Sequence, residues 1–140
     1  MRITRFLRNR LVTVEEMLSQ AASSTSQRCQ GRDVVVIQDT TVIRSTGGGG
    51  DYLHVAIALD GSDGAILGLV DGQFLQRSSG RRGQRRGSPV EEKESFRWLQ
   101  GADQAASVCA GADRITVIAD REGDIYEACL LYTSDAADEE

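Results

Sequence analysis

The chain has 140 residues, of which 40% are hydrophobic and 26% charged, and its formal net charge is −5. This length suits one domain with a core of its own, and the composition is typical of a globular protein. No stretch approaches the roughly 18 consecutive apolar residues of a membrane helix, and no signal-peptide core follows the arginines of the first ten residues. We therefore expect a cytoplasmic protein with no membrane partner.

The N-terminal half is predicted to form a helix and then three strands. Thr13 and Glu16 form a capping box that begins a short helix, and the polar stretch 22–31 is expected to end it. Apolar and β-branched runs then predict strands at residues 33–38, 52–59 and 65–74. The sequence Asp-Gly-Ser-Asp-Gly at 60–64 favours a tight turn, so the second and third strands should form an antiparallel hairpin.

The C-terminal half is predicted to contain a long helix, a strand and the start of another helix. Ser88, Pro89 and Glu91 are typical of a helix N-terminus, and the helix should run from about residue 89 to 110 and stop at Gly111. Its apolar stripe is expected to comprise Leu99, Ala102, Ala106 and Cys109. Residues 114–119 predict the fourth strand, and Asp124 is expected to cap a last helix.

This order of elements predicts an α/β fold with a ribonuclease-H-like mixed sheet and flanking helices. The hairpin would lie beside the first strand, and the crossover helix would let the fourth strand pair parallel to the first on its other side. The first and fourth strands are apolar runs without polar alternation, which predicts burial on both faces.

Both of these apolar strands lead into an aspartate, Asp39 and Asp120. Open α/β sheets usually place their chemistry at the carboxyl ends of parallel strands, so the two carboxylates should lie side by side. Magnesium prefers oxygen ligands, and two-metal sites stabilise the attacking and leaving oxygens of a phosphodiester. The alternative is a local role, in which Asp39 makes a turn with the backbone.

Five arginines without an intervening acidic residue form an arginine cluster: Arg77, Arg81, Arg82, Arg85 and Arg86. The cluster stands out because the last eleven residues carry four of the acidic side chains and no basic one, which leaves the rest of the chain close to neutral. Such a cluster indicates contact with the phosphates of nucleic acid, and a solvated basic loop is an equally good interpretation.

Histidine and cysteine offer few alternatives to this chemistry. Cys29, Cys109 and Cys129 are far apart in the sequence and form no CxxC pair, which favours reduced thiols over a zinc site or a disulfide framework. His54 is the only histidine and lies in an apolar strand, so we expect a structural imidazole rather than a metal ligand. No nucleophile elbow is present near a serine or cysteine.

Three segments together resemble the insertion sequence 4 family of bacterial DDE transposases. They are Ile37-Gln38-Asp39-Thr40-Thr41, Glu92-Lys93-Glu94-Ser95 followed by Trp98-Leu99, and Asp120-Arg121-Glu122-Gly123-Asp124-Ile125. The resemblance spans about residues 10–128, with the motifs in the family's order and spacing. It implies a core that cuts and joins transposon ends with magnesium or manganese, Asp39 and Asp120 being its first two catalytic, metal-binding aspartates. DNA and a second transposase subunit are the implied partners.

The chain also departs from this family. The third metal ligand, a glutamate in a Tyr-Arg-Glu-Lys signature, has no counterpart here, and neither has the β-rich insertion that precedes it in some members. The resemblance therefore implies a helical segment at 1–32, a truncated core at 33–128 and little or no transposition by this chain alone. Two other functions remain open: a non-catalytic fragment that binds DNA or transposase and inhibits it, and another ribonuclease-H-like nuclease.

The tail at residues 129–140 suggests a separate hypothesis. Its beginning, Cys-Leu-Leu-Tyr-Thr-Ser, is what TGT-CTC-TTA-TAC-ACA-TCT encodes, and that DNA resembles a transposon end used in sequencing adapters. We expect these residues to be a translated adapter, which fold reasoning should exclude. The alternative is a native acidic C-terminus, and the nucleotide sequence would distinguish the two.

Overall fold

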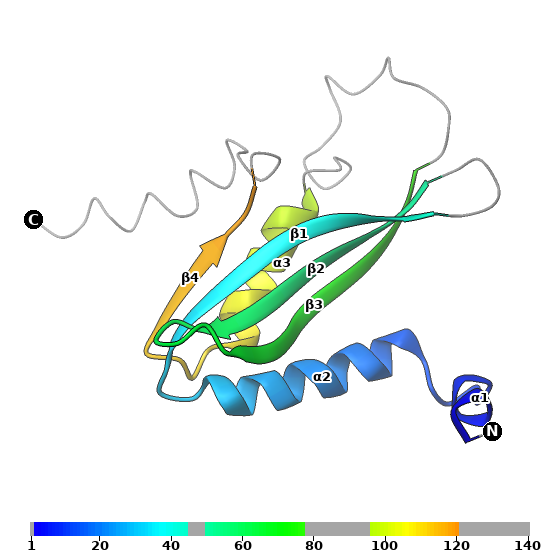
Figure 1. Cartoon of the computed structure of the whole chain (residues 1–140), viewed down its shortest axis with the longest axis horizontal. Helices are drawn as coiled ribbons and strands as arrows, with labels where there is room; N and C mark the ends of the chain where they lie inside the picture. The colour runs from blue at the N-terminus through cyan, green and yellow to red at the C-terminus, as the bar shows by residue number, and fades with distance from the viewer. Residues whose placement is uncertain (1, 45–49, 78–95, 121–140) are drawn as a thin grey trace, which may run out of the picture.

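A four-stranded mixed sheet forms the centre of the computed structural model, which describes residues 2–44, 50–77 and 96–120 (Figure 1). The strands are β1 (Asp33–Arg44), β2 (Gly50–Asp60), β3 (Ile66–Arg77) and β4 (Arg114–Ile118). They lie in the order β3-β2-β1-β4, with β1 antiparallel to β2, β2 antiparallel to β3, and β1 parallel to β4. The predicted α/β class, the hairpin and the parallel pairing of the first and fourth strands are confirmed.

Within the described residues, three helices accompany the sheet: α1 (Arg2–Leu7), α2 (Val14–Cys29) and α3 (Phe96–Val108). α2 packs mainly along β3, and α3 contacts all four strands. Both helices cover the same face of the sheet, so the described residues form two layers (Figure 1). Within these residues, no helix is long and apolar enough to cross a membrane.

α2 begins as predicted and continues further than predicted. The hydroxyl oxygen of Thr13 accepts a hydrogen bond from the Glu16 amide at 3.2 Å, which confirms the N-cap. α2 does end within the stretch 22–31, at Cys29, but it is longer than the short helix predicted, because Thr25 is fully buried against the sheet. Its hydroxyl lies 2.9 Å from the carbonyl oxygen of Ala21 and 2.7 Å from that of Leu69, and it shares its hydrogen between them. A tertiary contact thus outweighs the low helix propensity of a Ser/Thr run.

β3 bulges where α2 packs against it. The pairing of β3 with β2 shifts register at two places, between Ala56 and Ile57 and between Ala58 and Leu59. Gly68 lies in this region with a φ of 148°, and a Cβ there would collide with the Thr25 hydroxyl. The guanidinium of Arg28 donates to the Leu67 carbonyl oxygen at 2.6 Å. Glycine is therefore needed for the close approach of α2 to the sheet.

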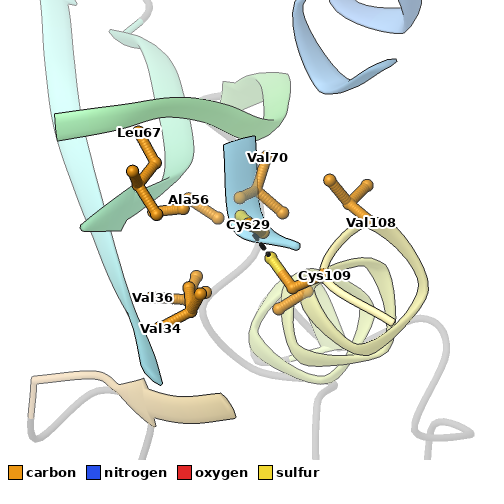
Figure 2. Packing of buried hydrophobic residues seen from close by; sticks show 10 residues of the cluster. Cys29, Val34, Val36, Ala56, Leu67, Val70, Val108 and Cys109 are labelled. Atoms are coloured by element: carbon orange, nitrogen blue, oxygen red, sulfur yellow. Dashed lines mark hydrogen bonds between the residues drawn. The ribbon is translucent and has the colours of Figure 1, made fainter. Parts of the chain in front are cut away.

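The hydrophobic core lies between the sheet and the two helices (Figure 2). Its buried members are Val34, Val36, Ala56, Ala58, Leu67 and Val70 from the strands, with Cys29, Ala105, Val108 and Cys109 from the helical layer. The sulfur atoms of Cys29 and Cys109 lie 3.6 Å apart as free thiols, as predicted for these two; Cys129 lies outside the described residues. Burial, and then the neighbouring Cys29, raise the pKa of Cys109 to about 12. That thiol therefore stays protonated at neutral pH.

β1 is buried on one face only. Val34 and Val36 point into the core at 2% and 0% exposure, whereas Ile37 is 40% exposed on the opposite face. Ile118, its partner on β4, is 47% exposed. The prediction of burial on both faces is wrong for the described residues, because both helices lie on one side and none of these residues forms a layer over the other. We call the two sides the covered face and the open face.

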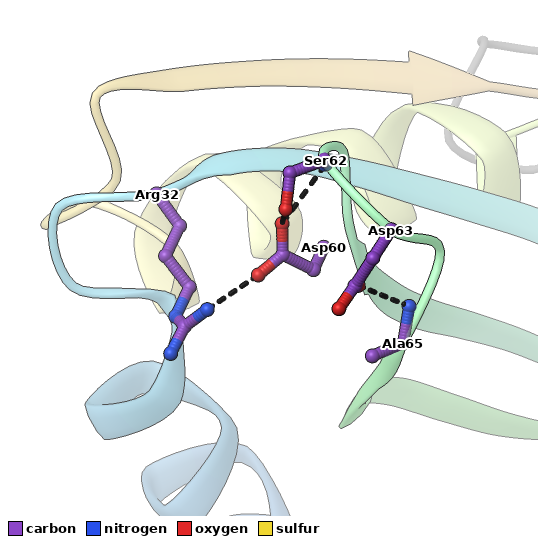
Figure 3. Close-up of polar contacts among 5 residues, drawn as sticks. All are labelled: Arg32, Asp60, Ser62, Asp63 and Ala65. Carbon is purple, nitrogen blue, oxygen red and sulfur yellow. Dashed lines mark hydrogen bonds and ion pairs between the residues drawn. The ribbon is translucent and has the colours of Figure 1, made fainter.

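The turn between β2 and β3 is tied to the start of β1 (Figure 3). Asp60 accepts hydrogen bonds from the hydroxyl of Ser62 at 2.6 Å and from its amide at 2.9 Å, and its other oxygen pairs with Arg32. Asp63 accepts from the Ala65 amide at 2.8 Å. The Ser62 bonds, followed by the Arg32 guanidinium, lower the pKa of Asp60 to about 2. This turn fixes the hairpin register at the edge remote from Asp39.

The described part of the long helix differs in one position from its predicted stripe. Leu99, Ala102 and Cys109 are buried as expected, but Ala106 is exposed, and Ala105 takes its place in the core. The predicted helix start at residues 88–91, and the helix expected after Asp124, lie outside the described residues. β4 ends at Ile118, one residue earlier than predicted.

Candidate metal site

The parallel pairing of β1 with β4 determines where the two aspartates lie. The ladder begins with Asp33 opposite Arg114 and ends with Ile37 opposite Ile118. Asp39 and Asp120 each stand two residues beyond that last pair, at corresponding positions, and both are exposed. Asp39 shares the open face with Ile37, because side chains alternate along a strand.

Asp39 lies within a strand and not at its end. β1 continues past it to Arg44, paired throughout with β2, and Asp39 itself pairs with Val55. Its Oδ1 accepts a hydrogen bond of 2.7 Å from the amide of Thr40 in this extended backbone. Asp39 therefore lies just beyond the end of the β1–β4 ladder, as expected, but the expectation that β1 itself ends there is wrong. The backbone at Asp39 is extended, so the alternative of a local turn is wrong as well.

A buried polar network lies on the covered face, directly behind Asp39. We call it the β1 network; its members are Gln38, Thr40, His54 and Arg97. His54 Nε2 lies 3.1 Å from Gln38 Oε1, and its Nδ1 lies 2.9 Å from Thr40 Oγ1. The Nε–H of Arg97 donates to the same Thr40 oxygen at 3.3 Å. His54, Gln38 and Arg97 are 1%, 3% and 8% exposed, so three of the four side chains are nearly inaccessible to water.

The hydrogen atoms of this network can be assigned from its two ends. Gln38 Oε1 can only accept, so His54 Nε2 carries the proton and donates to it. The Nδ1 of the neutral ring is then an acceptor, and it takes the hydroxyl hydrogen of Thr40. Arg97 can only donate, and the Thr40 oxygen retains a lone pair for it. Donors and acceptors are therefore matched from Arg97 through to Gln38.

His54 is held as a neutral imidazole. Its pKa is lowered first by burial and then by the positive charge of Arg97, against the opposing effect of Asp71, Asp39 and Asp120. Both ring nitrogens are bonded to protein groups, which leaves neither for a metal ion. The prediction of a structural histidine is confirmed. Asp39 and Asp120 are both close enough to the His54 ring for their negative charges to affect its pKa.

Helix α3 packs directly against the β1 network. The rings of His54 and Trp98 meet edge to face, with centroids 4.6 Å apart, and the Arg97 guanidinium lies 5.5 Å from the Trp98 centroid. A Cβ at Gly101 would collide with Gln38 Oε1, so glycine there lets the helix approach β1. Among the described side chains, the Trp98 indole nitrogen is the one buried polar atom without a hydrogen-bond partner.

Sequence reasoning gave no role to Gln38, Thr40 and Arg97. A signal was present, because Gln38 and His54 interrupt two apolar runs at positions that side-chain alternation places on the face of Val36 and Ala56. Polar residues at core positions of two paired strands indicate a hydrogen-bonded pair.

The edge of the sheet beyond the β1–β4 ladder carries two carboxylates, which are suitable ligands for a hard divalent cation. Asp39 and Asp120 are the ligand type that Mg²⁺ and Mn²⁺ prefer, which fits the expected ion. Across residues 2–44, 50–77 and 96–120, however, no group of three or more His, Cys, Asp or Glu side chains is arranged to hold a metal. Within the described residues, this edge of the sheet therefore carries two carboxylates at corresponding positions, Asp39 and Asp120.

Of the arginine cluster, only Arg77 belongs to a described element, and it is the last residue of β3. The other four arginines lie outside the described residues. β1, β3 and β4 all run in the same direction, so the chain leaves β3 for the cluster at the edge toward which Asp39 and Asp120 lie. Arg77 and Arg44 are aligned in the sheet, because both pair with Gly50 of β2. Arg44 lies five residues, or about 16 Å, further along β1 than Asp39.

No protein-family model matches the chain, and no curated protein matches it.

Proposed function

We propose that the chain is part of the catalytic core of a DDE transposase of the insertion sequence 4 type, with a ribonuclease-H-like fold. The complete enzyme would cleave and join DNA strands at transposon ends with Mg²⁺ or Mn²⁺. One observation carries the proposal: the β1–β4 register gives Asp39 and Asp120 corresponding positions, each two residues beyond the last pair of two neighbouring parallel strands. The antiparallel hairpin beside β1 and the crossover through α3 are what such a core requires.

In this proposal, Asp39 and Asp120 bind the metal ions through their carboxylate oxygens. The ions would supply activation of the attacking oxygen and stabilisation of the leaving oxygen. Asp39 presents its carboxylate from a rigid position, because β1 is paired with β2 on both sides of it. His54 takes no direct part, since its two nitrogens are occupied.

The remaining components of the proposed enzyme come from outside these elements. The resemblance requires a third carboxylate, and without it we propose that the chain alone carries out little or no strand transfer. The arginine cluster would contact the DNA backbone, and a second transposase subunit would complete the assembly. Phosphate contacts of this kind are weakened by salt, which distinguishes them from base-specific contacts.

Manganese binding to the full chain tests the proposed site. We expect weak binding of Mn²⁺, detected through the relaxation of water protons, and an affinity lower by about tenfold or more in Asp39→Asn and in Asp120→Asn. Asp33→Asn is the matched control, because Asp33 is an exposed carboxylate at the opposite end of the same β1–β4 ladder. Its affinity should equal that of the unmodified chain.

Equal affinity in all four proteins would contradict a metal site at Asp39 and Asp120. The chain would then be better explained as a non-catalytic fragment that binds DNA or transposase. In that case a DNA-binding measurement becomes decisive: neutralising the arginine cluster should weaken binding and flatten its dependence on salt.

A further inference from the structure

Thr40 links the two faces of the sheet at the candidate metal site. Its side chain belongs to the covered face, where its hydroxyl contacts His54 Nδ1 at 2.9 Å and Arg97 Nε at 3.3 Å. Its backbone amide donates to Asp39 Oδ1 at 2.7 Å, on the open face. A single residue therefore connects the buried network to the carboxylate that we propose as a metal ligand.

The network holds Thr40 in one orientation. The hydroxyl is fixed by a donor and an acceptor that come from different elements, α3 and β2. His54 is fixed in turn by Gln38, and Gln38 is confined by the close approach of α3 at Gly101. Rotation of the Thr40 side chain would leave the Nδ1 of a 1% exposed imidazole without a donor, which is costly in a buried site.

We propose that Thr40 and His54 are positioning residues for Asp39. They fix the Thr40 amide, which engages Asp39 Oδ1 and leaves Oδ2 to bind the cation. This inference rests on the proposed function, because it assigns the β1 network a role at the same metal site. It gives a reason for a hydroxyl at position 40 and an imidazole at position 54, neither of which packing alone requires. Groups that orient a metal ligand in this way affect metal affinity without touching the ion.

Replacement of Thr40 separates positioning from packing. Thr40→Val keeps the β-branched shape and removes the hydroxyl, whereas Thr40→Ser keeps the hydroxyl. We expect Thr40→Val to weaken Mn²⁺ binding by about tenfold and Thr40→Ser to restore it to nearly the unmodified value. Thr116→Val is the matched control: Thr116 is an exposed threonine in β4, opposite Val35, and should bind Mn²⁺ normally.

The single histidine provides a spectroscopic test of the hydrogen bond between Thr40 and the imidazole on which the positioning role depends. Nitrogen-15 chemical shifts of the imidazole should show the Nε2–H tautomer at neutral pH in the unmodified chain and in Thr40→Ser. In Thr40→Val the Nδ1 shift should move, because that nitrogen loses its donor. These spectra need no metal, and the spectrum of the unmodified chain tests the assigned hydrogen bonds even if Thr40→Val does not fold.

The outcomes separate the two proposals. Binding of Mn²⁺ that depends on Asp39 but is the same in Thr40→Val would overturn positioning and leave the metal site intact. An Nδ1–H tautomer in the unmodified chain would also overturn it, because Thr40 could not then donate to the ring. Binding that does not depend on Asp39 would overturn the proposed function and the positioning role together.

Discussion

The two faces of β1 differ sharply although their residues alternate one by one. On the covered face, Val34 and Val36 are buried in the core, and Gln38 is buried in a network with matched hydrogen bonds. On the open face, Ile37 is 40% exposed and Asp39 is exposed as well. One strand thus supplies the stabilising contacts on one side and the candidate ligands on the other.

This difference shows how an exposed carboxylate can be held in place. Asp39 is an exposed carboxylate on the open face. The covered face provides the restraint, because its network acts on Asp39 through the backbone of Thr40. Burial and the proposed metal ligand are therefore on opposite faces of β1, and Thr40 connects them.

The largest expected effect on stability comes from comparing a charge placed on the covered face of β1 with one placed on its open face. Val36→Asp should destabilise the protein by about 4 kcal/mol or more, because an unpaired carboxylate would lie in a core position of 0% exposure. Ile37→Asp, the next residue, should cost about 1 kcal/mol or less. Urea unfolding followed by circular dichroism measures both. Similar losses in the two variants would mean that the faces do not differ in burial.

A smaller effect is expected where α3 approaches the covered face. Gly101→Ala should gain about 1 kcal/mol from helix propensity, but the added methyl group would collide with Gln38 Oε1. We expect a net loss of about 1 to 3 kcal/mol and a shift of the His54 ring signals. Ala106→Gly, at an exposed position of the same helix, measures the propensity alone. A stabilised Gly101→Ala would show that the helix does not restrain Gln38.

Features that depend on neighbouring residues could be predicted from the sequence. The Thr13 cap is formed with Glu16, and the β2–β3 turn is built within residues 60–64, so both were predictable from local chemistry. The adjacency of Asp39 and Asp120 is a long-range feature, yet it followed from the order of elements, because a crossover helix makes the fourth strand parallel to the first.

Features that depend on contacts between distant elements could not be predicted. The length of α2 is set by Thr25, whose hydroxyl reaches a carbonyl 44 residues away. The β1 network joins residues of β1, β2 and α3 in geometry that no spacing encodes. One-sided burial of β1 also escaped prediction, since an apolar run does not indicate how many layers surround it.

The smallest expected effect is a dependence of the unfolding free energy on pH, which arises from His54 on the covered face. The pKa of His54 is lowered in the folded state, whereas the unfolded chain has a histidine pKa of about 6.5. On acidification the unfolded state therefore binds the proton first. The free energy of unfolding should be constant above about pH 7 and should fall below pH 6.5, by at most about 1.4 kcal/mol per pH unit.

His54→Asn tests whether the fall of the unfolding free energy at low pH is caused by protonation of the His54 ring. The variant carries no histidine, so its unfolding free energy should stay flat between pH 7 and pH 5, whatever its absolute stability. The sign of the dependence of stability on pH also shows which groups dominate the pKa of the imidazole. Burial and Arg97, on the covered side, lower its pKa, and Asp71, Asp39 and Asp120 oppose them. Stability that rose on acidification would mean that the carboxylates prevail and that His54 is charged, which would reverse the hydrogen-bond assignment of the β1 network.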